Sequence, residues 1–228
     1  MKPHQSPNRY CLPIIENSRS AVTAALQENL SVYRYAEIWL DYIEDLDRGF
    51  ASSLVGQYPH RLIFVFRRKN LATIELPESK RFEILKTLSR KPTLVDFDIT
   101  SQADDITNLS KFSLKTILSY HNYRQTPSDT ELRSIIERMS IWGAHITKIA
   151  TFCAIQRDAL RLLSLLIELR EAGKRCVVLG LGKHGMITRV FGAQWGNEMI
   201  LTPPEQSNQS AAGQITIDKL DSIMQALR

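Results

Sequence analysis

Eight short runs of apolar and β-branched residues recur along this chain, separated by segments with the periodicity of amphipathic helices. Several runs are unbroken, as in Leu62-Ile63-Phe64-Val65-Phe66, which is typical of strands covered on both faces. Eight strands alternating with helices over 228 residues predict a (β/α)8 barrel, and a doubly wound open sheet is the alternative. The expected strands are residues 10–15, 35–40, 62–66, 94–99, 114–120, 146–150, 175–181 and 198–201.

Helices are expected where a capping residue precedes an apolar periodic segment. The segments after Asp41 and Thr100 are less clearly helical than the others. No repeat, low-complexity stretch or linker divides the chain, so we expect residues 1–228 to form a single barrel domain. The clearer helices begin at Ser18 or Ser20 and reach 29, at Pro77-Glu78 and reach 88, after Thr126-Pro127-Ser128-Asp129 and reach 139, and span 157–172 and 216–227.

Composition places the chain among ordinary globular proteins, with 43% hydrophobic and 23% charged residues. It contains no apolar run of the ~20 residues that would span a bilayer, and no signal peptide opens it, so no membrane association is expected. Cys11, Cys153 and Cys176 are scattered and fit reduced thiols, which favours the cytoplasm. The net charge of +5 suggests an anionic partner, but the short basic clusters do not favour nucleic acid.

Polar residues that are awkward for a core fall where the predicted strands end. The carboxyl ends of barrel strands build the active site in this fold. Glu37 and Asp41 flank the end of the second strand, and Trp39 lies between them on the same face. Each residue has an ordinary explanation. The two carboxylates could accept backbone N–H groups.

Arg67, Asp98, His121 and Lys148 lie at or near the ends of the third to sixth strands. Arg67 could pair with Glu37, and His121 could be a hydrogen-bonded core histidine. Converging at one mouth, however, a lysine, a histidine, an arginine and a carboxylate can form an imine, move a proton and hold an anion.

Lys148 lies inside the apolar run Ile146-Thr147-Lys148-Ile149-Ala150. Burial removes hydration from an ammonium group, so this position needs an explanation. One interpretation is that the lysine reaches a rim or pairs with a carboxylate. The other is that the site lowers its pKa, so that a neutral amine attacks a carbonyl and forms a Schiff base.

The segment Gly180-Leu181-Gly182-Lys183-His184-Gly185 matches the glycine pattern of dinucleotide-binding loops. Too little of the chain follows Gly185 to complete a dinucleotide domain, and no acidic partner is clear at the expected spacing. We therefore expect no cofactor. The glycines are interpreted instead as a loop at the barrel mouth, where the backbone closely approaches a ligand.

Taken together, these segments resemble the type I 3-dehydroquinate dehydratases, which are (β/α)8 lyases of the shikimate pathway. The resemblance covers nearly the whole chain and depends on the order and spacing of its motifs. The matching pieces are Glu37-Ile38-Trp39-Leu40-Asp41, Phe66-Arg67, Ser119-Tyr120-His121-Asn122-Tyr123, Thr147-Lys148-Ile149-Ala150, Gly185-Met186-Ile187-Thr188-Arg189 with Val190-Phe191-Gly192, and Ser210-Ala211-Ala212-Gly213-Gln214.

The resemblance implies dehydration of 3-dehydroquinate, with Lys148 forming the imine and His121 acting as general acid and base. It implies a carboxylated small-molecule substrate, no metal or other cofactor, and a homodimer. Arg189, Ser210 and Gln214 would hold the substrate carboxylate. Glu37 and Arg67 would contact ring hydroxyls, Glu37 would also orient His121 or its neighbours, and Tyr123, Leu179 and Leu181 would form apolar wall.

This chain departs from the family pattern at three places. Trp39 stands where the family usually has arginine, Ala212 replaces a common proline, and the segment between Arg189 and Phe191 is shorter than usual. Two rival functions follow from the same residues. One is a class I aldolase, which would share the strand lysine but would require a phosphate grip. The other is a barrel that has lost catalysis and serves as a binding module.

Overall fold

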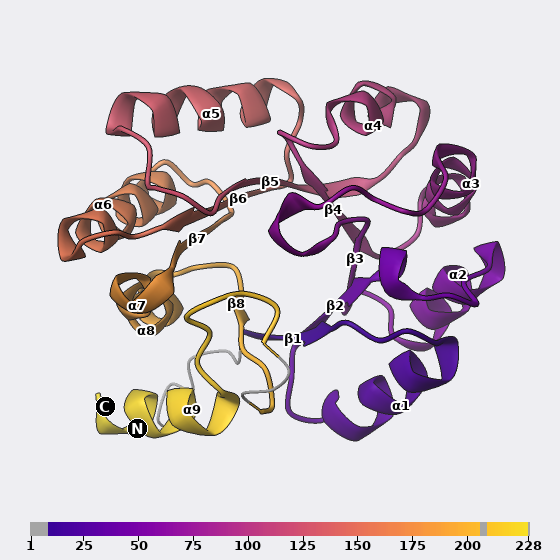
Figure 1. Ribbon diagram of the computed structural model, residues 1–228, viewed down its shortest axis with the longest axis horizontal. Helices are drawn as coiled ribbons and strands as arrows, with labels where there is room; N and C mark the ends of the chain where they lie inside the picture. Colours follow the sequence, from indigo (N-terminus) through magenta and orange to yellow (C-terminus); the bar gives the residue numbers. More distant parts are fainter. Residues whose placement is uncertain (1–8, 206–208, 228) are drawn as a thin grey trace.

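Eight parallel strands curl around a common axis and are surrounded by helices (Figure 1). The computed structural model describes residues 9–205 and 209–227. The order β7-β6-β5-β4-β3-β2-β1-β8 is that of a nearly closed (β/α)8 barrel, which confirms the predicted fold and excludes the doubly wound sheet. The strands are β1 (Tyr10–Ile14), β2 (Tyr35–Trp39), β3 (Leu62–Val65), β4 (Leu94–Asp98), β5 (Lys115–Asn122), β6 (Ile146–Phe152), β7 (Cys176–Leu181) and β8 (Ile200–Leu201).

The barrel closes between β7 and β8 without a regular strand ladder. The Glu198 N–H donates to the Cys176 carbonyl at 2.8 Å. The Asn197 side chain accepts the Val178 N–H at 2.7 Å and donates to the Val178 carbonyl at 3.1 Å. A side-chain amide thus replaces a strand segment here. The last strand is therefore shorter than the predicted 198–201.

The helices begin where side chains can satisfy their first N–H groups. Ser18 caps α1, and Ser128 forms a capping box with Glu131 at the start of α5. The expected helices are confirmed to within a few residues. The α-helices are α1 (Arg19–Asn29), α2 (Arg48–Gln57), α3 (Glu78–Leu88), α4 (Ala103–Thr107), α5 (Asp129–Ile141), α6 (Gln156–Glu171), α7 (Gly182–Gly185), α8 (Ile187–Trp195) and α9 (Ile217–Ala226); short 3-10 turns are η1 (Leu40–Tyr42), η2 (Lys69–Leu71) and η3 (Leu109–Lys111).

The glycine-rich segment folds as the end of β7 and as α7, and its Leu181 lines the pocket at the barrel mouth. A Cβ on Gly180 would lie 2.6 Å from the Gly185 Cα, and a Cβ on Gly185 would lie 2.3 Å from the Gly180 carbonyl carbon. The two glycines therefore let a helix backbone touch a strand backbone. Sequence analysis also missed α8, because it treated this whole region as a loop.

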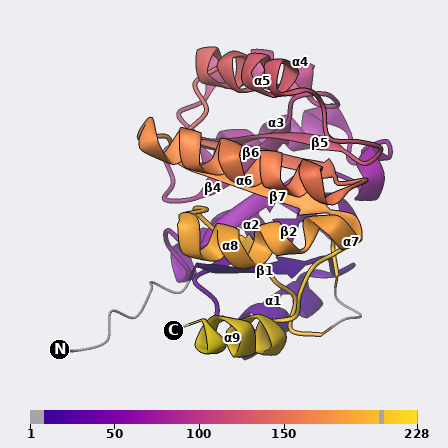
Figure 2. The same ribbon diagram turned by 90° about the vertical axis from the view of Figure 1, so that its left-hand side faces the viewer.

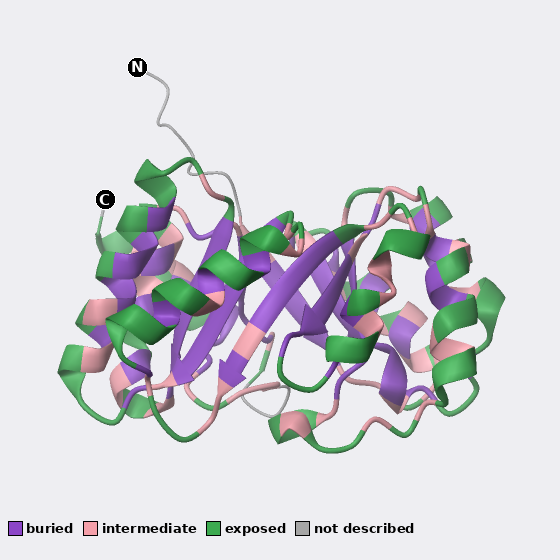
Figure 3. Cartoon of the chain, turned by 90° about the horizontal axis from the view of Figure 1, so that it is seen from above, coloured by how far each residue is buried: buried purple, intermediate pink, exposed green. Residues whose placement is uncertain are grey.

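Apolar packing fills two layers, one between sheet and helices and one inside the barrel. The strands are buried along their length, whereas the helices expose their outer faces (Figure 3). Inside the barrel, Ile63, Ile117 and Ile146 form an apolar cluster. Lys148 follows Ile146 on the same face of β6, one step closer to the carboxyl ends of the strands. The apolar cluster thus fills the deeper part of the barrel, and Lys148 lies between it and the carboxyl ends of the strands.

None of the helices within residues 9–205 and 209–227 combines the length and the apolar character that crossing a bilayer requires.

Candidate active site

One pocket at the carboxyl ends of the strands contains every residue to which the family resemblance gave a catalytic or substrate-binding role. It has about 400 Å³ of empty space, counting the space at its mouth. Tyr123, Ala150, Leu179, Leu181, Leu201 and Ala211 complete its wall. The predicted residues that line it are Glu37, Trp39, Arg67, His121, Lys148, Arg189, Ser210 and Gln214.

Lys148 is held between two carboxylates. Its Nζ donates to Glu37 Oε2 and to Asp96 Oδ2, both at 2.8 Å, and the residue is 3% exposed. Burial alone would lower the pKa of Lys148, but Asp96 and Glu37 more than offset burial, so the pKa is raised. The pKa of Lys148 is thus not lowered as predicted. The two ion pairs match the other interpretation, a lysine paired with carboxylates.

The three members of this cluster come from β2, β4 and β6. Side chains of alternate strands form a common layer inside a barrel, which explains why they meet. Sequence analysis missed Asp96, although it alternates with apolar neighbours in β4 and precedes Asp98 on the same face. The alternation could have shown that Asp96 faces the barrel interior. It could not have shown that Asp96 would contact Lys148.

Arg67 is paired with Asp96, whereas Glu37 was the partner that sequence analysis considered as an ordinary explanation. Its Nη1 lies 3.5 Å from Asp96 Oδ1 and donates to Ser119 Oγ at 3.1 Å. Ser119 in turn donates to Asp96 Oδ1 at 2.5 Å. Burial opposes ionisation of Asp96, but Lys148 and Arg67 lower its pKa to about 2. Asp96 is thus an anion shared by two buried cations.

His121 is oriented by Asp98, whereas the resemblance assigned that role to Glu37. The Nδ1 atom lies 2.7 Å from Asp98 Oδ2. Burial opposes ionisation of Asp98, but the hydrogen bond from His121 keeps its pKa well below the usual range. An ionised Asp98 fixes the hydrogen on Nδ1 and leaves the Nε2 lone pair available.

The neutral form of the same imidazole is favoured. Burial and the nearby Arg67 lower the pKa of His121, and Asp98 only partly counteracts them. A neutral ring with a bare Nε2 is the form required of a general base.

Arg189 is buried without an anionic partner in the described part of the chain. It is 1% exposed, its Nη1 donates weakly to the Leu201 carbonyl at 3.4 Å, and its Nε has no partner. Burial lowers the pKa of Arg189 to about 10. Ser210 and Gln214 lie beside it in the pocket wall and bond to one another, with Gln214 Nε2 donating to Ser210 Oγ at 2.8 Å. A buried cation without a counter-ion is costly, and a bound anion would relieve that cost.

Trp39 faces the pocket with Glu37, as predicted. Its Nε1 donates to Glu37 Oε1 at 3.0 Å, and the Arg67 guanidinium lies 5.4 Å from the centre of the indole ring. The indole thus hydrogen-bonds to one carboxylate oxygen of Glu37 and packs against the guanidinium of Arg67.

Asp41 lies outside this pocket lining. It accepts the Leu76 N–H at 2.7 Å and an Arg68 Nε hydrogen bond at 2.6 Å, which matches the structural explanation given for it above.

Among the residues that the structure describes, no group of three or more histidine, cysteine or carboxylate side chains is arranged to hold a metal ion. The pocket offers instead an amine, an imidazole and a guanidinium.

Comparison with known proteins identifies relatives that share this framework. The 3-dehydroquinate dehydratase of Pyrococcus abyssi is 30% identical over 195 residues, covering 84% of this chain and 86% of that protein. The Methanosarcina barkeri enzyme of the same name is 29% identical over 233 residues, covering 93% and 96%. A type I 3-dehydroquinate dehydratase structure from Clostridium difficile shares the fold, with a TM-score of 0.80, 22% identity and coverage of 96% and 92%. The model of type I 3-dehydroquinase matches residues 10–228, and the chain therefore belongs to that family.

Proposed function

We propose that this protein is a carbon–oxygen lyase that dehydrates 3-dehydroquinate to 3-dehydroshikimate in the shikimate pathway. The observation that carries the proposal is the meeting of Lys148, His121 and the unpaired Arg189 in one pocket of a type I 3-dehydroquinase chain. The buried, free thiols of Cys11, Cys153 and Cys176 support the expected cytoplasmic location.

Lys148 forms an imine with the ring ketone. Its ammonium group first gives a proton to Glu37, whose Oε2 lies 2.8 Å from Nζ, while Asp96 stays ionised. The amine then adds to the carbonyl carbon, and Glu37 returns the proton to the hydroxyl of the carbinolamine, which leaves as water to give an iminium. The iminium takes the place of the ammonium between the two carboxylates. The field that raises the pKa of Lys148 therefore also stabilises this cation.

His121 moves the proton. Its Nε2 removes a hydrogen from the carbon beside the iminium, and the electron pair passes to nitrogen to give an enamine. The electron pair returns to expel the ring hydroxyl, which leaves as water with the proton from His121. Water then hydrolyses the conjugated imine, and Lys148 is released. Asp98 positions His121 throughout.

Arg189, Ser210 and Gln214 hold the substrate carboxylate, because a guanidinium can bind it through two parallel hydrogen bonds. Glu37 and Arg67 contact ring hydroxyls. Trp39 supplies apolar wall where the family usually has a charged contact, so the hydroxyls are held less tightly on that side.

Turnover of 3-dehydroquinate, followed by the absorbance of the conjugated product, tests this function. A class I aldolase would instead cleave phosphorylated aldols, and a barrel serving only as a binding module would turn over neither. Activity on a phosphorylated aldol but none on 3-dehydroquinate would replace the proposal with the aldolase function.

Arg189→Met is expected to raise KM for 3-dehydroquinate more than tenfold, since charge-assisted hydrogen bonds contribute about 1.5–3 kcal/mol. Methionine fills much of the same volume and removes an uncompensated buried charge, so Tm should stay unchanged or rise. Steady-state kinetics and thermal unfolding measure both effects. Arg48→Ala on the exposed start of α2 is the control, and an unchanged KM in Arg189→Met would contradict the assignment.

We also propose that the protein forms a homodimer through the outer face of α6, which Figure 2 shows facing the viewer. Leu160 and Ile167 are 60% and 41% exposed there, with the small Ser164 between them. Arg157 lies near the start of the helix and Glu171 at its end. An antiparallel copy of α6 would place Leu160 against Ile167 and Arg157 against Glu171. This self-complementarity suits a two-fold interface.

Ile167→Glu is expected to convert the dimer to a monomer, because it places carboxylates in the centre of that contact. Sedimentation equilibrium measures the change, with Ile223→Glu on the exposed face of α9 as the control. A dimer that survives Ile167→Glu, or a wild type that is monomeric, would eliminate this interface.

A further inference from the structure

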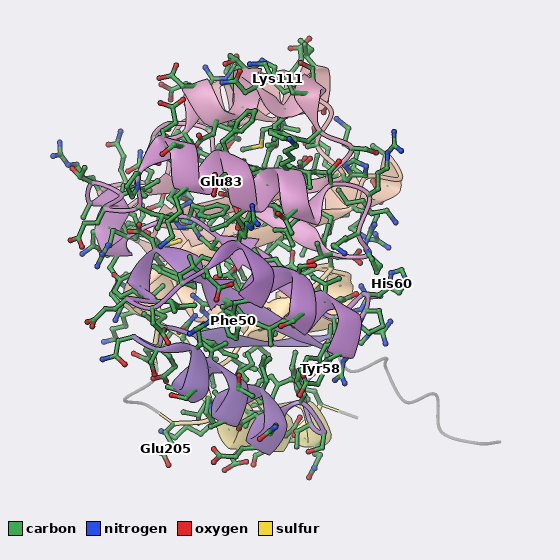
Figure 4. The ribbon with its side chains drawn as sticks, turned by 90° about the vertical axis from the view of Figure 1, so that its right-hand side faces the viewer. Phe50, Tyr58, His60, Glu83, Lys111 and Glu205 are labelled. Atoms are coloured by element: carbon green, nitrogen blue, oxygen red, sulfur yellow. The ribbon has the colours of Figure 1, made fainter. Side chains whose placement is uncertain are left out.

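Basic side chains gather at the end of the barrel opposite the pocket. Figure 4 shows the two ends: His60, which precedes β3, lies on the opposite edge from Glu205, which follows β8. The segments that lead from a helix into the next strand contain six arginines and lysines but a single carboxylate, Glu198. Arg9 and Lys115 add to this charge at the starts of β1 and β5. The six are Arg34, Arg61, Arg90, Lys91, Lys174 and Arg175.

Two adjoining hollows open at this end, and both are lined by Arg34 and Tyr35. Their empty volumes, which include open solvent, are about 1130 and 680 Å³. The charges therefore surround a concave surface. The larger hollow is lined by Arg9, Ser31, Val32, Tyr33, Arg34, Tyr35, Arg61, Arg170 and Glu198, and the smaller by Arg34, Tyr35, His60, Leu62, Pro92, Thr93, Leu94, Lys115 and Arg175.

The arginines of the larger hollow are only partly used by the fold. Arg61 donates to backbone carbonyls, including that of Leu30 at 2.5 Å, and Arg9 donates to the Asn197 carbonyl at 3.1 Å. These partners carry no net charge. Within residues 9–205 and 209–227, Arg34 and Arg170 form no ion pair.

Glu198 is already paired, because Arg175 Nη2 lies 2.6 Å from its Oε1. Helix C-termini attract cations, but each carries only about half a negative charge. Arg34 follows α1 by several residues and its guanidinium lies 5.7 Å from the centre of the Tyr35 ring. The positive charge of the hollow therefore exceeds what the fold neutralises.

We propose that this hollow binds a small polyanion with several phosphate groups, held chiefly by Arg34 and Arg170. Arginine binds phosphate oxygens bidentately, and two arginines that line one hollow suit a ligand with more than one anionic group. A concave site fits a compact ligand better than a duplex. Arg34 also lies over the Tyr35 ring and covers one face on which a base of single-stranded nucleic acid could stack. The site lies apart from the catalytic pocket and does not depend on the proposed reaction.

Titration calorimetry with tripolyphosphate tests the site. We expect one-to-one binding that weakens as salt is raised. The double variant Arg34→Ala/Arg170→Ala should weaken binding about tenfold or more, because each arginine donates charge-assisted hydrogen bonds. Arg48→Ala/Arg124→Ala removes the same charge from exposed positions at the other end of the barrel and should leave binding unchanged.

Glu198→Gln provides a test in the opposite direction. It keeps the side-chain volume, removes the carboxylate that faces the hollow and frees Arg175, so tripolyphosphate should bind more tightly. The proposal would be overturned if the wild type did not bind tripolyphosphate, or if the two double variants lost affinity equally. Weaker binding of tripolyphosphate by Glu198→Gln would also overturn it. Binding of a single-stranded oligonucleotide without binding of tripolyphosphate would reassign the surface to nucleic acid.

Discussion

Lys148→Ala abolishes turnover of 3-dehydroquinate and prevents formation of a borohydride-stable adduct: this is the largest effect we expect. No other lysine lines the pocket within the described residues, so no neighbouring amine can form the imine. Loss of a covalent nucleophile should lower kcat by on the order of 10⁵-fold or more. In the wild type, treatment with substrate and borohydride should add mass to the peptide that contains Lys148.

Lys183→Ala is the matched control, because Lys183 is an exposed lysine of α7 that does not line the pocket. It should leave both adduct and turnover unchanged. An adduct on a different lysine, or turnover near the normal rate in Lys148→Ala, would refute the proposed mechanism.

The same substitution should destabilise the fold. Removing one partner of a buried ion pair typically costs about 3–5 kcal/mol, because the other charges remain buried. Glu37 and Asp96 would lose the cation that each contacts at 2.8 Å, and only Arg67 would remain beside Asp96. Removal of a buried lysine without such partners would instead leave stability unchanged or slightly raise it.

The pH dependence of unfolding distinguishes these expectations. In the wild type, the pKa of Asp96 is lowered to about 2 in the folded protein. Ionised Asp96 therefore contributes its full stabilisation at pH values above its pKa in the unfolded chain, and this stabilisation is lost as pH falls toward its pKa in the folded protein. Without Lys148 the carboxylates take up a proton more readily, which relieves their repulsion. The difference in Tm between wild type and Lys148→Ala should therefore narrow as pH falls from neutral toward the acid range.

The sequence contained enough to place the strands and the pocket lining. Strand period and turn residues determine which side chains face the barrel interior, so Glu37, Trp39, His121 and Lys148 could be assigned to one face of their strands. Arg189 needed the family resemblance, because the helix that carries it was not predicted.

The pairing of charges could not be predicted in the same way. Whether Arg67 meets Glu37 or Asp96, and whether Lys148 is an ammonium, depends on how alternate strands are layered across the barrel. A single sequence without tertiary contacts does not specify that layering. The contact between Gly180 and Gly185 could not be predicted for a related reason, since it joins two backbones and leaves no side-chain pattern in the sequence.

His121→Ala should lower kcat by about 10²–10⁴-fold, the usual contribution of general acid–base catalysis. The nitrogen of the imine comes from Lys148 and not from His121. The borohydride adduct on Lys148 should therefore still form, although more slowly. This separates His121 from Lys148, whose loss removes both. Turnover within a few-fold of wild type in His121→Ala would reassign proton transfer, with Glu37 the next candidate in the pocket.

Asp98→Asn tests how the histidine is held. Asp98 raises the pKa of His121 against the lowering caused by burial and by Arg67, so its neutralisation should lower that pKa further. Activity that depends on neutral imidazole falls as pH drops through this pKa. The acid limb of kcat/KM should therefore move to lower pH in Asp98→Asn.

The maximum rate should nevertheless decrease in Asp98→Asn, because asparagine can donate to Nδ1 and so favour the tautomer with its hydrogen on Nε2. A carboxylate with a merely structural role would change stability without moving the pH profile. Asp98→Glu keeps the charge and should retain the wild-type limb if its longer chain still reaches Nδ1. An Asp98→Asn enzyme with an unshifted acid limb and an unchanged kcat would exclude Asp98 as the residue that positions the general base.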